Sequence, residues 1–198
     1  MKKLILLCVV ALSSVNSFAQ LWDNSKPDKR VTFGVRAGAN CSTWYLGYDD
    51  DGYFEAKAKW GLYGGVNVDF NIVKSFAIET GLFFSEKGCK GDNESWEWRY
   101  KEKQKYSYVQ IPLFALYRLP LSEDFHMQVK AGGYIGLCCD HPERRRYYRD
   151  VDAGPVFGLG LSYRKIYLGA QYELGLMELD GYFESKNRNL TISVGYDF

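Results

Sequence analysis

Apart from Cys8 near the N-terminus, the chain has four cysteines, and these are the residues best suited to covalent chemistry: Cys41, Cys89, Cys138 and Cys139. In an exported protein such thiols can form disulfides. Cys41 and Cys89 are one possible pair, and a cysteine of the Cys138–Cys139 dipeptide could compete. A bond within that dipeptide would be strained, and free thiols are the alternative. His141 lies nearby, but the spacing typical of zinc ligands is missing, so we expect neither a metal site nor a cofactor.

A second candidate site is a dense basic cluster formed by Arg144, Arg145, Arg146 and Arg149. Arginine binds phosphate with two parallel hydrogen bonds, so the cluster is a candidate contact for lipopolysaccharide or another polyanion. A solvated loop, paired with the acidic run at 49–51, is the simpler interpretation, because exposed charge runs are common. Over the whole chain 25 basic residues nearly balance 24 acidic ones, so we expect no nucleic-acid binding.

Catalysis has little support in the sequence. His141 beside Asp140, with Ser42 in another loop, is the arrangement closest to a lipid-modifying enzyme of the outer membrane. The chain has only 2 histidines and no nucleophile motif. We therefore predict a protein that is not an enzyme, with the lipid-modifying enzyme as a minor alternative.

The elements that position these residues are two-faced strands. From Val31 the odd positions up to Ala39 are apolar, and the even positions are small or polar. The pattern recurs seven times and ends at Phe198. Each run is about 9–11 residues long, which is the length that a tilted strand needs to cross hydrocarbon. The sequence thus predicts an all-β fold, an eight-stranded antiparallel up-and-down transmembrane β-barrel over residues 31–198.

The polar face of these strands carries a nearly balanced set of charges: Arg36, Asp69, Glu79, Arg118, Lys130, Glu173 and Asp197. Many glycines share this face, and small residues suit the crowded interior of an eight-stranded barrel. We therefore expect the polar face to line the lumen and the apolar face to meet lipid. Buried charges must be paired, so the set predicts a hydrogen-bonded plug, and eight strands leave too little room for an open pore.

The connections between strands alternate in length. Long ones are expected near 41–59, 88–105, 138–153 and 176–188, and short ones near 71–74, 119–124 and 164–165. This rhythm is typical of extracellular loops and periplasmic turns, and it places all four cysteines at the extracellular rim and both termini in the periplasm. Aromatic residues at strand ends fit interfacial girdles. Pro112 lies within the predicted fourth strand, where we expect a bulge or an open hydrogen bond.

The N-terminus has the features of a secretory signal. Lys2 and Lys3 precede an apolar run from Leu4 to Leu12, and small residues at Ser17 and Ala19 fit a cleavage site. We predict a signal peptide over 1–19 and a short periplasmic lead over 20–30.

Several segments resemble the PorT-like outer-membrane β-barrel family of Bacteroidetes-type bacteria. They are Tyr108–Leu113, the glycine-rich fifth strand, Asp152 to Gly154 with Gly158 to Gly160, and the closing segment Asn189–Phe198. The resemblance implies insertion by the barrel-assembly machinery, with Phe198 at the place of the terminal aromatic signal. It implies no catalytic residues.

Taken together, these features predict a non-enzymatic protein of the bacterial outer membrane. Its role would be structural, adhesive or one of surface contact through the long loops. Its expected partners are membrane lipid, lipopolysaccharide and the barrel-assembly machinery. The alternative is an accessory component of an envelope secretion or transport system, which would bind other envelope proteins.

Overall fold

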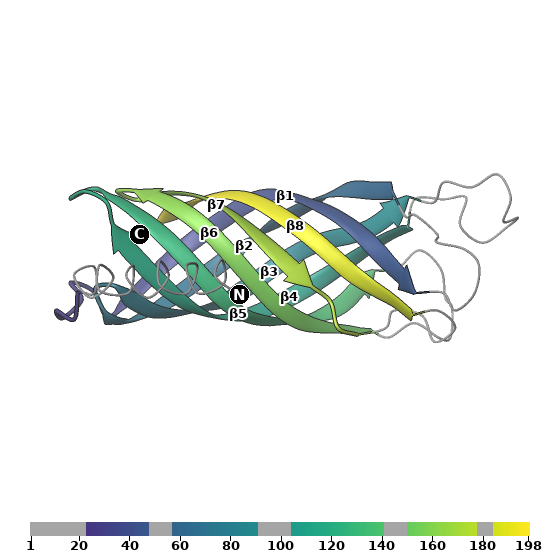
Figure 1. Cartoon of the computed structure of the whole chain (residues 1–198), viewed down its shortest axis with the longest axis horizontal. Coiled ribbons are helices and arrows are strands. Elements are labelled where there is room, and N and C mark those ends of the chain that lie inside the picture. The colour runs from purple at the N-terminus through teal and green to yellow at the C-terminus, as the bar shows by residue number, and fades with distance from the viewer. Residues whose placement is uncertain (1–22, 48–56, 91–103, 141–149, 178–183) are drawn as a thin grey trace, which may run out of the picture.

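The computed structural model describes residues 23–47, 57–90, 104–140, 150–177 and 184–198, and over these it forms a closed barrel of eight strands. Every strand pairs antiparallel with the next one, and β8 pairs with β1 (Figure 1). The predicted up-and-down barrel is confirmed. The strands are β1 (Val31–Gly47), β2 (Lys57–Val73), β3 (Phe76–Lys90), β4 (Gln104–Pro120), β5 (Phe125–Asp140), β6 (Val151–Tyr163), β7 (Ile166–Leu174) and β8 (Glu184–Asp197). Within the described ranges, no helix is both long and apolar enough to cross a membrane.

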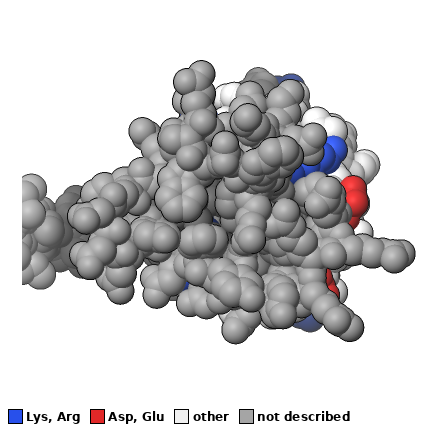
Figure 2. Space-filling view, turned by 90° about the vertical axis from the view of Figure 1, so that its right-hand side faces the viewer, with Lys and Arg blue, Asp and Glu red and all other residues white. Residues whose placement is uncertain are grey.

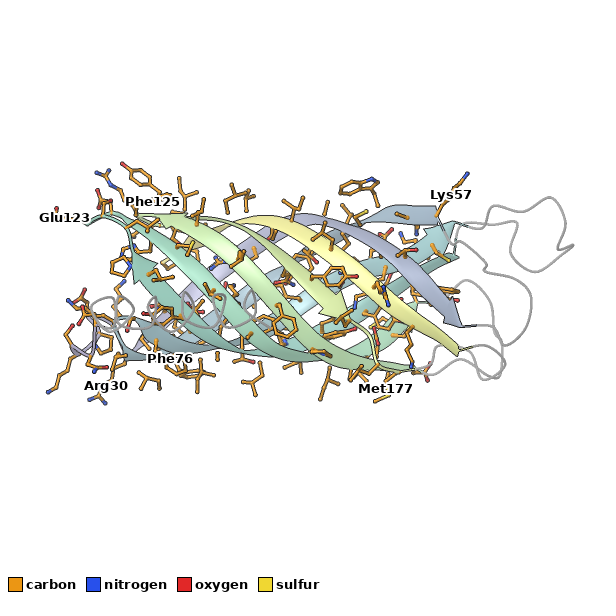
Figure 3. The ribbon with its side chains drawn as sticks, in the orientation of Figure 1. Arg30, Lys57, Phe76, Glu123, Phe125 and Met177 are labelled. Carbon is orange, nitrogen blue, oxygen red and sulfur yellow. The ribbon has the colours of Figure 1, made fainter. Side chains whose placement is uncertain are left out.

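The two faces of the wall are divided as the alternation predicts. Apolar side chains point outward along the barrel (Figure 3), and Leu113 keeps 63% of its surface exposed. The opposite phase is buried inside, where Arg36 keeps 5% and Lys130 keeps 4%. Large apolar side chains are exposed in this way along every strand, and an apolar surface that extends around a whole barrel is typical of a face that meets lipid.

The two ends of the barrel differ (Figure 1). At one end, here called the turn end, short connections join β2 to β3, β4 to β5 and β6 to β7, and the C-terminal residue Phe198 lies there. At the other, here called the loop end, the chain passes through 48–56, 91–103, 141–149 and 178–183, which are outside the described residues.

The predicted loop boundaries were wrong at the loop end, because the strands run further than the alternation suggests. β1 continues to Gly47 and β3 to Lys90, although loops were expected from 41 and 88. Ladder hydrogen bonds hold a strand together in water as well as in lipid. Once the wall leaves hydrocarbon, however, its outer residues no longer need to be apolar, so the period-two hydrophobic signal ends before the strand does.

Pro112 leaves an opening in the ladder between β3 and β4. Paired positions stop at Thr80↔Leu113 and resume at Phe83↔Gln110 in the same register. Proline has no N–H to donate, which accounts for the gap. The Thr80 hydroxyl donates to the Pro112 carbonyl oxygen at 2.7 Å and replaces part of the lost pairing. The expected open hydrogen bond is thus confirmed, and no bulge is needed.

The described part of the predicted lead, residues 23–30, is tied to the turn between β2 and β3. The Lys74 amide donates to the Ser25 carbonyl at 3.2 Å, and the Asn71 amide donates to the Arg30 carbonyl at 2.9 Å. Lys29 Nζ donates to the Phe198 carbonyl at 3.2 Å. The lead therefore lies at the turn end, next to the C-terminus.

Candidate functional site

The lumen is the site that gathers the polar chemistry of the chain, and it can be described in layers. Nearest the turn end, Arg36 pairs with Asp197 at 2.7 Å, from β1 to β8. Arg118 pairs with Asp69 at 2.6 Å and also donates to Asn71 Oδ1 at 2.6 Å. The first contact joins the neighbouring strands β1 and β8, and the second joins β2 to β4 past the intervening strand β3.

The middle layer contains a buried pair and an aromatic ring. Lys130 Nζ lies 2.7 Å from Glu79 Oε1, and both side chains are almost fully buried. The Tyr167 ring lies 4.7 Å from Lys130 Nζ and 4.2 Å from the Arg36 guanidinium carbon, so it faces both cations. Gly160 makes room for this ring, because a Cβ there would lie 2.5 Å from Tyr167 Cε2. A cation–π stack thus joins the middle layer to the layer nearest the turn end.

The upper layer is built around Lys87, whose side chain is completely buried. Its ammonium lies 2.8 Å from Glu173 Oε2 and 3.4 Å from Asp152 Oδ2. Tyr134 donates its hydroxyl to Asp152 Oδ2 at 2.7 Å, and Asn187 donates to the same oxygen at 2.9 Å. The Tyr134 ring also lies 4.2 Å from the ammonium. This cluster joins side chains from β3, β5, β6, β7 and β8.

Above this layer, β3 approaches β1 across a distorted part of β2. The register between β2 and β3 shifts between Ala58 and Tyr63. Asn40 Nδ2 on β1 donates to the Glu86 carbonyl at 3.1 Å, and Ser42 Oγ donates to the Gly88 carbonyl at 2.9 Å. Side chains of β1 therefore bond directly to the backbone of β3, which draws the wall inward near the loop end.

A small apolar cluster lies inside the barrel at this level. It consists of the buried side chains Trp44, Cys89, Tyr106 and Tyr108, with Cys138 packed against them. The rings of Trp44 and Tyr106 lie 5.4 Å apart. Ion pairs and aromatic rings thus occupy the described interior from one end to the other.

The cysteines are free thiols on strands, not at the starts of loops as expected. Cys89 and Cys138 face the lumen, whereas Cys41 lies in the outward phase of β1 and Cys139 is an exposed residue where the β4–β5 register shifts. Of the alternatives left open by the sequence, the Cys41–Cys89 bond is not formed, because the two thiols point to opposite sides of the wall. Cys89 and Cys138 lie on strands that are both neighbours of β4 and not of one another. Two strand spacings, about 9.5 Å, exceed the Cα separation that a disulfide spans.

The seven predicted lumen charges all lie inside the barrel, and six of them form three ion pairs: Arg36 with Asp197, Arg118 with Asp69, and Lys130 with Glu79. The partner of the seventh, Glu173, was missed in the sequence. It is Lys87, which shares the inward phase of β3 with Glu79 but lies past the last apolar residue of that run. Extending the inward phase of β3 by a few residues past the apolar run would have identified Lys87. Extending the inward phase of β6 in the same way would have identified Asp152.

The other predicted contacts cannot be placed in the same way. Arg144, Arg145, Arg146, Arg149 and His141 lie outside the described residues. At the edge of the loop end, basic and acidic side chains are both exposed (Figure 2). Of the described residues there, Lys57 and Lys105 are exposed, as are Asp140 and Asp150. No three His, Cys, Asp or Glu side chains of the described chain gather in a way that could hold a metal ion.

Comparison with known proteins agrees with this architecture. The barrel is similar to Neisserial surface protein A (NspA), with a TM-score of 0.53 and 12% identity over 86% of this chain and 100% of that one. It is also similar to OprG from Pseudomonas aeruginosa, with a TM-score of 0.48 and 12% identity over 89% and 99%. A third match is Ail of Yersinia pestis, with a TM-score of 0.43 and 13% identity over 86% and 100%. At these identities the NspA match shows the fold alone. No curated protein matches the sequence.

The family is shown by a sequence model. Residues 18–181 match the model described as "Outer membrane protein beta-barrel domain", which is most of the chain. Together with the lipid-facing apolar wall, this places the protein in the bacterial outer membrane. The chain belongs to the outer membrane protein β-barrel domain family.

Proposed function

We propose that the protein is a closed, non-enzymatic barrel that serves the outer surface of the cell by contact, in a structural or adhesive role. Short turns face the periplasm in barrels of this kind, so the loop end would face outward. The long segments at that end, with Arg144, Arg145, Arg146 and Arg149, would contact lipopolysaccharide or another polyanion. Phe198 would serve the barrel-assembly machinery during insertion, as the PorT-like resemblance implies.

The observation that carries this proposal is the network of buried, paired charges in the lumen. Lys87, Lys130 and Arg36 are all buried and paired with carboxylates from other strands. Moving such charges apart in a medium of low dielectric constant costs free energy, so the network favours a closed state over a passage. If nothing passes through the lumen, the parts of the barrel left to contact other molecules in water are its loops and turns.

The closed state is tested by conductance. The purified barrel in planar lipid bilayers is expected to give no sustained channel currents, in contrast to a porin measured as a positive control. Stable, long-lived channels in the wild-type protein would contradict a contact role that rests on a plugged lumen.

The contact role is tested on cells that lack the gene and carry either the wild-type protein or a variant. In the variant, Arg144, Arg145, Arg146 and Arg149 are replaced by glutamine. We expect the variant to insert normally, as judged by its mobility shift on boiling, and to bind immobilised lipopolysaccharide less well. The matched control replaces four basic residues at the turn end by glutamine: Lys26, Lys29, Arg30 and Lys74. It removes the same number of positive charges from the end that would face the periplasm. Equal binding by both variants would show that the loop arginines are not the contact.

An accessory role in an envelope secretion or transport system is the second candidate. The observation in its favour is the charged turn end, where Arg30 and Glu123 project from the wall (Figure 3) and the lead is held against the barrel. Crosslinking in intact cells followed by purification would recover defined envelope proteins if this role is correct. Recovery of none would favour the contact role.

A further inference from the structure

A row of exposed side chains crosses the outer wall near the turn end. Tyr163 on β6 pairs with Ile166 on β7, and Ile166 pairs with Tyr196 on β8. Paired positions of neighbouring strands point to the same face of a sheet, and these three side chains are 50%, 61% and 40% exposed. The row therefore consists of two outward-facing phenol rings with an aliphatic side chain between them.

The two residues of the β6–β7 turn place positive charges over this row. The Arg164 guanidinium carbon lies 5.4 Å from the centre of the Tyr163 ring, and Lys165 Nζ lies 5.7 Å from the centre of the Tyr196 ring. A cation within about 6 Å of an aromatic ring is attracted to its face. Since both rings are on the outside of the barrel, the two cations lie over the outer surface and not over the lumen.

The positive charge of this turn is only partly balanced. Arg164 Nε lies 3.1 Å from Asp124 Oδ2, and the two side chains are 66% and 50% exposed. This contact uses Nε and leaves the terminal amino groups of the guanidinium available for phosphate oxygens. Within the described residues, no carboxylate lies at ion-pair distance from Lys165. One positive charge therefore remains unbalanced at the outer surface of the turn.

A second row, closer to the middle of the barrel, is entirely aliphatic. Leu168 on β7 pairs with Leu161 on β6 and with Val194 on β8, and these side chains are 49%, 41% and 56% exposed. Tyrosine is typical of the interface between membrane and water, and aliphatic residues are typical of the hydrocarbon. Cations, phenol rings and aliphatic side chains thus follow one another in the order in which a phospholipid presents its phosphate, its glycerol esters and its acyl chains.

We propose that this surface is a binding site for one acidic glycerophospholipid in the leaflet that surrounds the turn end. Lys165 and Arg164 bind the phosphate, and an acyl chain lies on Ile166 and Leu168. An acidic lipid is favoured over a zwitterionic one, because its net negative charge balances the unbalanced lysine. The site lies at the opposite end of the barrel from the loop arginines, so it does not depend on the proposed contact role.

The test is native mass spectrometry of the folded barrel, released from micelles that contain equal amounts of phosphatidylglycerol and phosphatidylethanolamine with the same acyl chains. One basic side chain near an acidic lipid surface changes binding about fivefold. We expect the wild-type barrel to retain phosphatidylglycerol at least about fivefold more often than phosphatidylethanolamine. Lys165→Gln should lower this ratio by about fivefold, and Lys165→Arg, which keeps the charge, should retain it.

The matched control is Lys26→Gln. It also removes one positive charge from the turn end, but from an exposed residue of the lead, which is held against the β2–β3 turn. Lys26→Gln should keep the wild-type ratio, and the mobility shift on boiling shows that each variant is folded. Equal retention of the two lipids by the wild-type barrel would overturn the proposal. An equal loss in Lys26→Gln and Lys165→Gln would overturn it as well, because the preference would then come from the overall charge of the turn end.

Discussion

Lys87 is the residue on which the upper lumen depends. Its side chain has no exposed surface and is the only cation of the described lumen that contacts Asp152 and Glu173. Removing one partner of a buried ion pair leaves the other charges uncompensated, which costs about 3–5 kcal/mol. The same removal at an exposed pair costs under about 1 kcal/mol, because water solvates the remaining charge.

We therefore expect Lys87→Met to lower the free energy of unfolding by about 3–5 kcal/mol, measured from urea titrations of the folded barrel in micelles. The matched control is Lys105→Met, since Lys105 pairs with Glu86 at 3.0 Å with 51% of its side chain exposed. The control should lose less than about 1 kcal/mol. Equal losses in the two variants would contradict a central role for the buried cluster.

At the scale of elements, the turn between β6 and β7 contains a residue in an uncommon backbone conformation. Arg164 has φ of 54°, in the left-handed region, and it follows directly on Tyr163 at the end of β6. Two-residue hairpin turns require such angles, and asparagine adopts them more readily than other residues with a side chain. The Arg164 side chain pairs with Asp124 at 3.1 Å, but both groups are largely exposed, so this pair contributes little.

Arg164→Asn is expected to leave the urea midpoint unchanged or slightly higher, because the left-handed conformation costs asparagine less. Arg164→Val should destabilise the barrel by about 1 kcal/mol or more relative to Arg164→Asn, since a β-branched residue is strained there. Both variants lose the Asp124 contact, so the comparison isolates the backbone. Identical midpoints would show that the turn tolerates any residue.

At the scale of the whole molecule, the apolar outer face determines where the barrel resides. Leu113 lies in the middle of the outward run of β4 and is 63% exposed, whereas Leu121 lies in the turn after that strand and is 57% exposed. The two side chains are similarly exposed, but from their places in the barrel we expect lipid around Leu113 and water around Leu121.

We expect Leu113→Arg to reduce the stability of the barrel in lipid bilayers by about 2–4 kcal/mol, the cost of arginine near the bilayer midplane. Leu121→Arg, the control, should change it by less than about 0.5 kcal/mol. Refolding into vesicles followed by denaturant titration measures both. A similar small effect at both positions would indicate that the face around Leu113 does not meet hydrocarbon.

The orientation of the barrel can be tested with its own thiols. With the loop end outside, a membrane-impermeant maleimide added to intact cells should label a variant whose only mature cysteine is Cys139, which is exposed. A variant that retains only Cys89 should stay unlabelled, because this thiol is 2% exposed inside the wall. Labelling of Cys139 only after the outer membrane is permeabilised would place the loop end in the periplasm.

The sequence alone determined the number of strands, their antiparallel order and the face that meets lipid. These follow from local rules: alternation has a period of two, glycines and charges share one phase, and connection lengths alternate. The same rules identified seven lumen charges, from Arg36 to Asp197, because each falls on the inward phase of an apolar run.

Only the tertiary structure decided which charges meet and where the strands end. Strands that are distant in sequence face one another across the lumen, so the pairing of Lys87 with Asp152 and Glu173 depends on the barrel's register, which no local pattern encodes. The alternation of apolar residues could not predict that β1 and β3 extend beyond the lipid. Those segments are stabilised as strands by ladder hydrogen bonds and not by apolar side chains. The register shift between β2 and β3, near the place where Asn40 contacts the Glu86 backbone, could not be predicted from the sequence either. A bulge has no characteristic residue types that would reveal it.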